Sequence, residues 1–267
     1  MSRLSLIIIG FGAFGQLVAE LLRPHANIWI CDPSAEARER AHAHRIPLAL
    51  EADFSSADMI ILSMPTHALE SCLNWISPLL LPGQIVVDVC SVKEKPALLM
   101  QAILPRGVEI IATHPMFGPQ SAKNGISGLQ MVICPVRGKR WRPLARFLRE
   151  GLGLRVIVTT PEEHDRQAAA TQGLTHLLAR ALGIFEHRPL IRTRSFELLM
   201  EAVAMVSNDA PEVFDTIIHG NRHMLQVKAT LMAALERCGD PRLRDDAIEK
   251  AVNIPKIQFA PPDRTNG

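Results

Sequence analysis

The sequence contains no tyrosine, and aromatic side chains make up only 4% of its 267 residues. The missing tyrosine permits no functional inference by itself. The five cysteines are odd in number and widely scattered, and no two of them form a Cys-X-X-Cys pair. This pattern argues against a disulfide framework and against a zinc site, and it is typical of proteins in a reducing cytoplasm.

A strong excess of charge and a long apolar run are also missing. The formal net charge is +2, and the basic residues are dispersed except between residues 137 and 149, which we interpret as the solvated face of one helix. Nucleic acid is therefore not expected as a partner. No apolar run approaches the roughly 20 residues needed to cross a membrane, and the amino terminus lacks the features of a signal peptide. We expect a cytoplasmic globular protein that does not enter a membrane.

The first chemical motif that is present is a glycine-rich turn between an expected strand and an expected helix. The apolar run Leu4–Ile9 is followed by Gly10-Phe11-Gly12-Ala13-Phe14-Gly15 and then by a helical pattern up to Pro24. The first glycine permits a tight turn, the second lets a pyrophosphate approach the backbone, and the third lets helix and strand pack closely. A lone motif of this kind is weak, but its place between strand and helix predicts a dinucleotide site.

An acidic residue at the end of the second expected strand, Ile28–Cys31, extends this site. Asp32 lies 17 positions beyond the last glycine of the turn, where a carboxylate accepts hydrogen bonds from the adenosine ribose. The carboxylate would repel a 2′-phosphate, and the two residues after it include no arginine, so NAD is expected before NADP. As an alternative, Asp32 caps the helix expected near Ala35, and both roles can hold together.

Strands and helices continue to alternate to about residue 160. The alternation predicts a doubly wound, mostly parallel α/β sheet of the Rossmann type. The expected strand Met59–Leu62 ends at Ser63-Met64-Pro65, which we also assign to the cofactor site. The strand near residues 85–89 leads into a turn that holds Ser91 and Lys93 beside the expected nicotinamide position. Ser91 could instead simply cap the next helix.

The strand that begins at Ile110 stops on His114 and turns at once through Pro115. In an open parallel sheet the ligand crevice lies beyond the carboxyl ends of the strands, so an imidazole at this position meets the ligand. The alternative is that His114 merely ends a strand. The polar loop that follows, up to Gly128, contains Ser121.

Strand signals vanish at Pro161, and helical periodicity dominates to about Ile248. We therefore expect a dinucleotide-binding domain at 1–160, a helical domain at 161–252 that includes a helix near 246–252, and a loose tail at 253–267. Gln172 and His176 share one face of the first helix, which either lines a pocket or packs through alanines with one satisfied core histidine.

Two further features belong to the helical region. Glu201 is the acid in the middle of the apolar stripe of an expected helix, Phe196–Val206. His219 and His223 stand at i and i+4, but no carboxylate or thiolate lies at ligand spacing, so we place both on the surface and expect no metal.

Five motifs, in order along the chain, resemble the prephenate/arogenate dehydrogenase family, and the match is close to its plant-like arogenate branch. The motifs are the glycine turn, Asp88-Val-Cys-Ser-Val-Lys93, Thr113-His-Pro-Met-Phe-Gly-Pro119 with Lys123-Asn-Gly125, Glu162-Glu-His-Asp165 and Gln172-Gly-Leu-Thr-His176. The resemblance implies a nucleotide-binding domain joined to a helical dimerisation domain, hence a homodimer. It also implies NAD(P)-dependent oxidative decarboxylation of arogenate or prephenate in tyrosine biosynthesis.

The resemblance also assigns roles to individual residues. The family's catalytic histidine falls on His114, its partnering serine on Ser91 and the histidine of its substrate pocket on His176. Lys93 and Gln172 join His176 as candidates for binding the substrate carboxylates, and Ser121 is a further candidate contact.

The sequence departs from the family pattern at two positions. The plant enzymes generally use NADP, whereas Asp32 favours NAD. Prephenate-specific members carry an arginine where this chain has Glu201, whose carboxylate would pair with the ammonium of arogenate. The alternative is that Glu201 faces solvent or pairs with Arg192 or Arg194.

Two rival interpretations remain open from the sequence. A 3-hydroxyacid dehydrogenase or imine reductase shares the glycine turn and the helical second domain, but it does not explain His-Pro-Met-Phe-Gly-Pro. A catalytically silent cofactor-binding regulator is the other, and the joint presence of His114, Ser91 and His176 argues against it.

Overall fold

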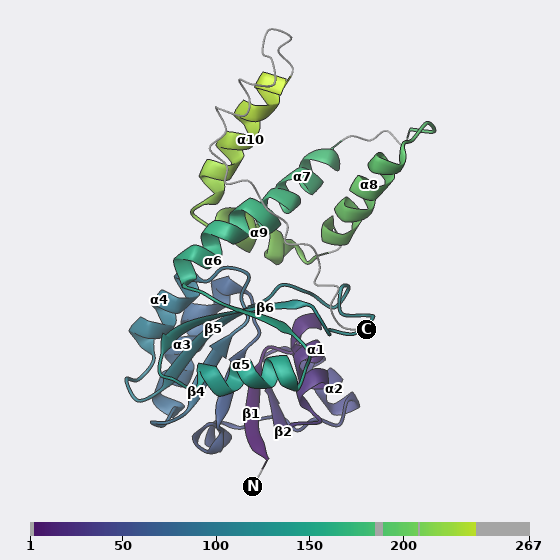
Figure 1. Cartoon of the computed structure of the whole chain (residues 1–267). Coiled ribbons are helices and arrows are strands. Elements are labelled where there is room, and N and C mark those ends of the chain that lie inside the picture. Colours follow the sequence, from purple (N-terminus) through teal and green to yellow (C-terminus); the bar gives the residue numbers. More distant parts are fainter. Residues whose placement is uncertain (1–2, 185–188, 208, 239–267) are drawn as a thin grey trace.

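The computed structural model describes residues 3–184, 189–207 and 209–238. It contains one seven-stranded sheet with helices on both faces, and a helical part that rises from one end of the sheet (Figure 1). The sheet order is β2-β1-β3-β4-β5-β6-β7, and every neighbouring pair is parallel except β5 and β6. The strands are β1 (Leu4–Ile9), β2 (Ala26–Cys31), β3 (Met59–Leu62), β4 (Ile85–Asp88), β5 (Glu109–Pro115), β6 (Gln130–Arg137) and β7 (Arg155–Val158). The predicted doubly wound, mostly parallel sheet is therefore confirmed.

The helices that cover the sheet alternate with its strands. They are α1 (Ala13–Leu22), α2 (Ala35–Ala43), α3 (Leu69–Ile76), α4 (Glu94–Ile103) and α5 (Trp141–Glu150), with short 3₁₀ turns at Glu51–Ser56, Thr66–Ala68 and Ser77–Leu79. The helix expected from about His67 thus opens as a 3₁₀ turn and becomes α-helical only at Leu69. Turns of this kind are common at helix termini.

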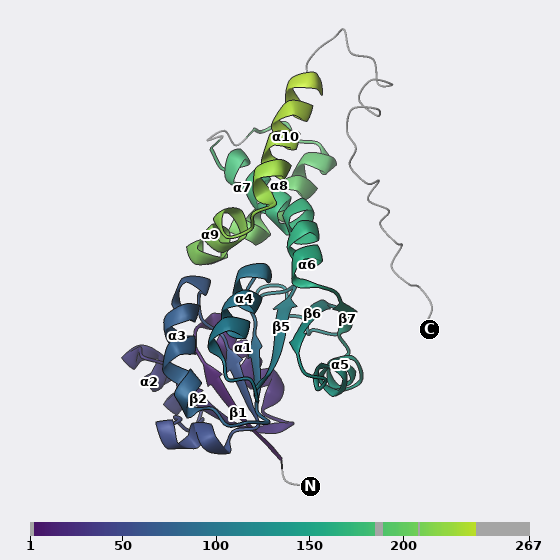
Figure 2. The same cartoon turned by 90° about the vertical axis from the view of Figure 1, so that its left-hand side faces the viewer.

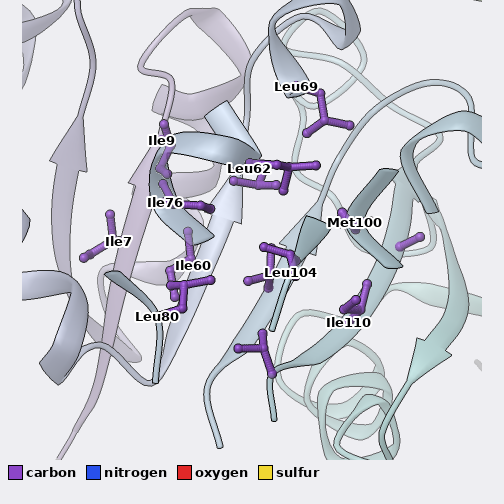
Figure 3. Packing of buried hydrophobic residues seen from close by; sticks show 14 of the residues in the cluster. Ile7, Ile9, Ile60, Leu62, Leu69, Ile76, Leu80, Met100, Leu104 and Ile110 are labelled. Carbon is purple, nitrogen blue, oxygen red and sulfur yellow. The ribbon is translucent and has the colours of Figure 1, made fainter. Parts of the chain in front are cut away.

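The central strands β3, β4 and β5 form because their aliphatic side chains are mostly buried on both sides of the sheet, whereas Ile157 and Val158 of the edge strand β7 are exposed. Along β1, Ile7 and Ile9 face the core beneath α3 and α4, whereas Leu6 and Ile8 face the core beneath α1 and α2. Figure 3 shows the first of these cores, in which side chains of β1, β3 and β5 meet those of α3 and α4. Each such aliphatic side chain contributes about 1.5–3 kcal/mol when it leaves water.

The antiparallel pair β5 and β6 extends further than the sequence predicts. His114 lies opposite Val132, and the pairing continues to Arg137, three residues beyond the expected end of the second strand. The extra length comes from the ladder with β5, which local hydrophobicity does not reveal.

The helical part begins at Pro161, the residue predicted from the change in periodicity. Thr160 caps the first helix by accepting a hydrogen bond from the Glu163 N–H at 3.2 Å, and Pro161 occupies the first helical position. The helices are α6 (Pro161–Ala168), α7 (Leu174–Leu182), α8 (Arg194–Ser207), α9 (Pro211–His219) and α10 (Met224–Cys238). In Figures 1 and 2 the helices α7, α8 and α10 rise from the end of the sheet at which β5 stops. In Figure 1, α7 and α8 lie next to each other and α10 lies apart from them.

A π-helical turn, Ala169–Gly173, joins α6 to α7 where the sequence predicts regular helix. Gly173 packs so closely against α10 that an added Cβ would lie 2.2 Å from the sulfur of Met224. The predicted helix at 246–252 and the predicted tail at 253–267 lie outside the described residues. No helix in the described ranges is long and apolar enough to cross a membrane.

Candidate active site

The glycine turn lies at the carboxyl ends of β1 and β3, and its three glycines differ in what surrounds them. A Cβ on Gly10, whose φ is +96°, would lie 2.2 Å from the Ser63 carbonyl oxygen, and a Cβ on Gly15 would lie 2.1 Å from the Gly10 carbonyl oxygen. A Cβ on Gly12 would meet nothing within 4 Å. Two glycines are therefore required by packing, and the third faces open space.

No capping side chain and no acidic side chain lies at the amino terminus of α1. Gly12 is the N-cap, no side chain caps the helix, and its first turn contains no acid. The N–H groups of the first turn are therefore free to bind an anion, as the predicted pyrophosphate site requires. Ser63 belongs to the turn that packs against the glycine turn, and its buried hydroxyl has no hydrogen-bond partner among the described residues.

The other predicted cofactor residues lie around this turn in different ways. Phe11 is buried, so only its backbone faces the site, and the side chain of Phe14 is half-buried. Met64 is half-buried, and Pro65 is exposed at the start of the 3₁₀ turn that leads to α3. These residues shape the turn, and they offer no charged group to a ligand.

Asp32 is tied to the glycine turn. Its Oδ2 accepts from the Phe11 N–H at 2.7 Å, and its Oδ1 accepts from the Ser34 N–H at 2.8 Å. The side chain that caps α2 belongs to Ser34, so the alternative of Asp32 as the helix cap is not what the structure shows. Arg38, to which no sequence motif assigns a role, donates to the carbonyls of Asp32 at 3.2 Å and Pro33 at 2.7 Å. A basic group therefore stands beside Asp32, one helical turn into α2.

His114 lies at the end of β5 and is 3% exposed. Its Nδ1 lies 2.9 Å from Nε2 of His164, whose Nδ1 lies 2.7 Å from Oδ1 of Asp165. Burial lowers the pKa of His114 well below 6.5, and electrostatic interactions with His164 and Lys93 lower it further. The imidazole is therefore neutral at pH 7. His164 and Asp165 belong to the sequence motif Glu162-Glu-His-Asp165, but nothing in the local sequence links them to His114.

Lys93 does not reach the predicted substrate site. The side chain is fully buried, and its ammonium forms an ion pair with Asp88 and donates to the Thr113 carbonyl at 2.5 Å. The ammonium is therefore paired inside the protein and is not available to a substrate carboxylate. The structure supports a structural role for Lys93 in place of the predicted substrate contact. Ser91 is half-buried at the same edge of the sheet as His114, but no hydrogen bond joins these two described residues.

The helix face predicted to line a pocket contains the buried imidazole of His176 and the half-buried amide of Gln172. His176 is 3% exposed, and its Nε2 lies 3.5 Å from Oδ2 of Asp209. Burial lowers the pKa of His176, and Asp209 opposes that shift. Gln172 lies on the π-helical turn, and its buried Oε1 has no hydrogen-bond partner among the described residues.

Three other residues lie in surroundings that differ from those expected from the sequence. Glu201 is exposed and pairs with Arg194 at 3.4 Å, which is the alternative that the sequence left open and which argues against a role as substrate selector. Ser121 is exposed, and its hydroxyl bonds only to the backbone of Gly118. His223 is not a free surface residue, since its Nε2 lies 3.0 Å from a carboxylate oxygen of Glu94. Its expected neighbour His219 is exposed. No cluster of three potential metal ligands occurs within the described part of the chain.

Residues 18–158 match the family described as prephenate dehydrogenase, nucleotide-binding domain. Among curated proteins, arogenate dehydrogenase 2, chloroplastic, of Arabidopsis thaliana is 32% identical over 247 residues, which cover 88% of this chain and 69% of that protein. Arogenate dehydrogenase 1, chloroplastic, of the same plant is 32% identical over 80% of this chain and 35% of that protein. The chain thus spans about two thirds of the first relative and about one third of the second.

Two solved structures share the fold. Prephenate dehydrogenase from A. aeolicus in complex with hydroxyphenyl propionate and NAD+ superimposes with a TM-score of 0.72 at 20% identity, over 88% of this chain and 89% of that one. Synechocystis arogenate dehydrogenase superimposes with a TM-score of 0.63 at 20% identity, over 87% of this chain and 90% of that one.

Proposed function

The chain belongs to the prephenate/arogenate dehydrogenase family, and from this premise we propose that it catalyses the NAD-dependent oxidative decarboxylation of arogenate to tyrosine. Prephenate, which would give 4-hydroxyphenylpyruvate, is the alternative substrate. The observation that carries the proposal is the buried imidazole of His114, neutral at pH 7, at the edge of the sheet where the glycine turn also lies. The two relatives named arogenate dehydrogenase support arogenate over prephenate.

The cofactor fits the residues of this edge. The open space at Gly12 and the uncapped start of α1 suit a pyrophosphate, and the carboxylate of Asp32 suits the hydroxyls of the adenosine ribose. When bound, the nicotinamide supplies the acceptor for the hydride. We place NAD before NADP because the Asp32 carboxylate repels a 2′-phosphate, while the neighbouring Arg38 already donates to two carbonyls.

His114 takes the part of general base. Its Nδ1 is occupied by His164, so Nε2 is the nitrogen that can accept the proton of the substrate hydroxyl as hydride leaves the carbinol carbon. The resulting ring ketone receives the electron pair of the C–C bond to the ring carboxylate, carbon dioxide departs, and the aromatic ring forms. The proton on His114 then returns to the phenolic oxygen. Ser91, at the same edge, is proposed to hold the hydroxyl in register.

On the helical side we propose that Gln172 and His176 contact the substrate. The unpartnered Oε1 of Gln172 is an acceptor that a ligand's N–H or O–H could satisfy, and the imidazole of His176 is held in place by its pairing with Asp209. Lys93, Ser121 and Glu201 are not part of this proposed set. We further propose the division into a nucleotide-binding domain at 1–160 and a helical domain at 161–252.

A homodimer is the proposed assembly, and apolar side chains on the helical part support it. Exposed apolar residues recur along one stripe of α8 and one stripe of α10. They are Leu198 and Met205 on α8, and Leu225, Met232 and Leu235 on α10. Within the described residues these side chains are between 50% and 81% exposed, which is the environment expected of an interface.

Steady-state rates of cofactor reduction, with arogenate and prephenate each measured against NAD and NADP, test the proposal. We expect the highest kcat/KM for arogenate with NAD. A failure to reduce either cofactor with either substrate would refute the function, whereas a higher kcat/KM for prephenate would refute only the substrate preference.

A further inference from the structure

We infer that His164 and Asp165 are a positioning pair that holds His114 in the one tautomer able to act as a base, and that this pair acts only when α6 is seated on α4. The inference rests on the proposed function, in which His114 accepts the hydroxyl proton. Both residues come from the helical part, and neither one reaches the proposed reacting atoms except through His114.

The hydrogen-bond roles follow from Asp165, because an ionised carboxylate can only accept. Asp165 Oδ1 lies 2.7 Å from Nδ1 of His164, so that nitrogen carries a proton. A neutral His164 then has a lone pair on Nε2, which must accept from the Nδ1–H of His114 at 2.9 Å. The proton of a neutral His114 is thereby placed on Nδ1, and Nε2 is left bare. The three side chains are each no more than 4% exposed, so water does not compete for these bonds.

The same carboxylate caps a helix of the sheet part. Asp165 accepts from the backbone N–H groups of Lys93 at 2.7 Å and of Glu94 at 3.0 Å, and α4 has no side-chain cap of its own. On the other side, Asn221, between α9 and α10, donates to the Asp165 carbonyl at 2.7 Å. The orientation of His164 is therefore coupled to contact among α4, α6 and the turn before α10.

The surroundings of His114 explain why such a pair is needed. Burial and the ammonium of Lys93 oppose a proton on His114, and Asp88 is already engaged with Lys93. Asp165 is then the carboxylate that stabilises the imidazolium formed during turnover, through the polarised ring of His164.

Two substitutions at His164 distinguish the loss of the hydrogen-bond acceptor to His114 from a mere change in the packing of the side chain. His164→Gln keeps an oxygen that can accept from the His114 Nδ1–H, whereas His164→Leu removes the acceptor. We expect kcat to fall by no more than about tenfold in the first variant and by roughly a hundredfold or more in the second, with KM and NAD affinity little changed. Equal losses in both variants would overturn the inference.

A third variant tests the carboxylate. The Asp165 oxygen that lies beside His164 also accepts from the Lys93 N–H, so the oxygen of Asp165→Asn can keep both bonds while the negative charge is lost. The His114 proton should then stay on Nδ1, and kcat should fall by about tenfold or more because the charge that stabilises the imidazolium is absent. Arg222→Gln is the matched control, because Arg222 pairs with Glu94 and Glu162 at the same seam without touching the histidines, and its kcat should stay within about twofold. An unchanged kcat in Asp165→Asn would refute the role of the carboxylate.

Histidine ¹⁵N NMR gives a readout that does not depend on turnover. In the full chain the His114 signal, assigned by its loss in His114→Asn, should show the Nδ1–H tautomer, and in His164→Leu, which removes the acceptor, the Nε2–H tautomer should become populated. An Nε2–H tautomer in the unmodified protein would overturn the inference. If the unmodified protein reduces no cofactor with either substrate but shows the Nδ1–H tautomer, the proposed function fails and the positioning pair stands.

Discussion

At the scale of single residues, His114 is the side chain on which proposed turnover depends. We expect His114→Asn to lower kcat by roughly two to four orders of magnitude, since a general base contributes about that much. NAD affinity should hardly change, because Asp32 and the glycine turn are separate from the imidazole. Stopped-flow reduction of NAD and a binding titration measure the two quantities, and an unchanged kcat would remove His114 from the mechanism.

The environment of His114 also sets the acid limit of activity. Its pKa is lowered by burial, and its protonated form cannot accept the hydroxyl proton. A lowered pKa moves the loss of activity to more acidic pH, so kcat/KM should remain on its plateau at pH 6.5, where an ordinary imidazole is half protonated. A pH profile of kcat/KM from 5 to 8 checks this. A half-maximal point at or above 6.5 would contradict it.

Cofactor choice depends on the balance between Asp32 and Arg38. Asp32→Ser should narrow the preference for NAD by removing the charge that repels a 2′-phosphate. The guanidinium of Arg38 is then free of that competing carboxylate, so any gain with NADP should disappear in Asp32→Ser combined with Arg38→Gln. The ratio of kcat/KM for the two cofactors is the measurement. Equal use of NAD and NADP by the unmodified protein would refute the assignment of Asp32.

At the scale of elements, the turn from β1 to α1 separates a ligand requirement from a packing requirement. Gly12→Ala adds a methyl group to open space, so the protein should fold normally while the Kd for NAD rises by roughly tenfold or more, about 1.4 kcal/mol. Gly15→Ala drives a methyl group into the Gly10 carbonyl and should cost about 1–3 kcal/mol of stability. Thermal melts and NAD titrations of the two variants distinguish these effects. Equal behaviour of both would contradict the division.

The elements themselves were predictable wherever a local pattern determines them. The apolar runs of β1 and β3 and the glycine turn between strand and helix were sufficient for the sheet, because a strand buried on both faces is apolar throughout. Local patterns could not reveal that the Lys93 ammonium is paired with Asp88 and bonded to the Thr113 carbonyl. They also could not reveal that His164 joins His114 across 50 positions of the chain. Both contacts exist only after the sheet and the helical part have come together.

At the scale of the whole molecule, the exposed stripes of α8 and α10 predict association. Met205→Glu should shift the protein from dimer toward monomer, because a charge in a desolvated interface lacks a partner. Leu98→Glu is the control, since Leu98 is 66% exposed on α4, away from both stripes, and its mass should match that of the unmodified protein. Light scattering over a range of concentrations gives the masses. A monomeric unmodified protein, or a dimer unaffected by Met205→Glu, would contradict the proposed interface.

The π-helical turn at Ala169–Gly173 divides the helix into two stretches that respond differently to a change of chain length. A turn of this kind holds about one residue more than a turn of α-helix. Deletion of the exposed Thr171 should therefore restore regular α-helix and leave the residues beyond it on nearly the same face. A residue inserted into α7 ahead of His176 has no such turn to absorb it, so everything beyond it would rotate by about 100° and advance by about 1.5 Å relative to the sheet. His176 would then leave the side of the helix on which it meets Asp209, although no residue of the proposed site had been substituted.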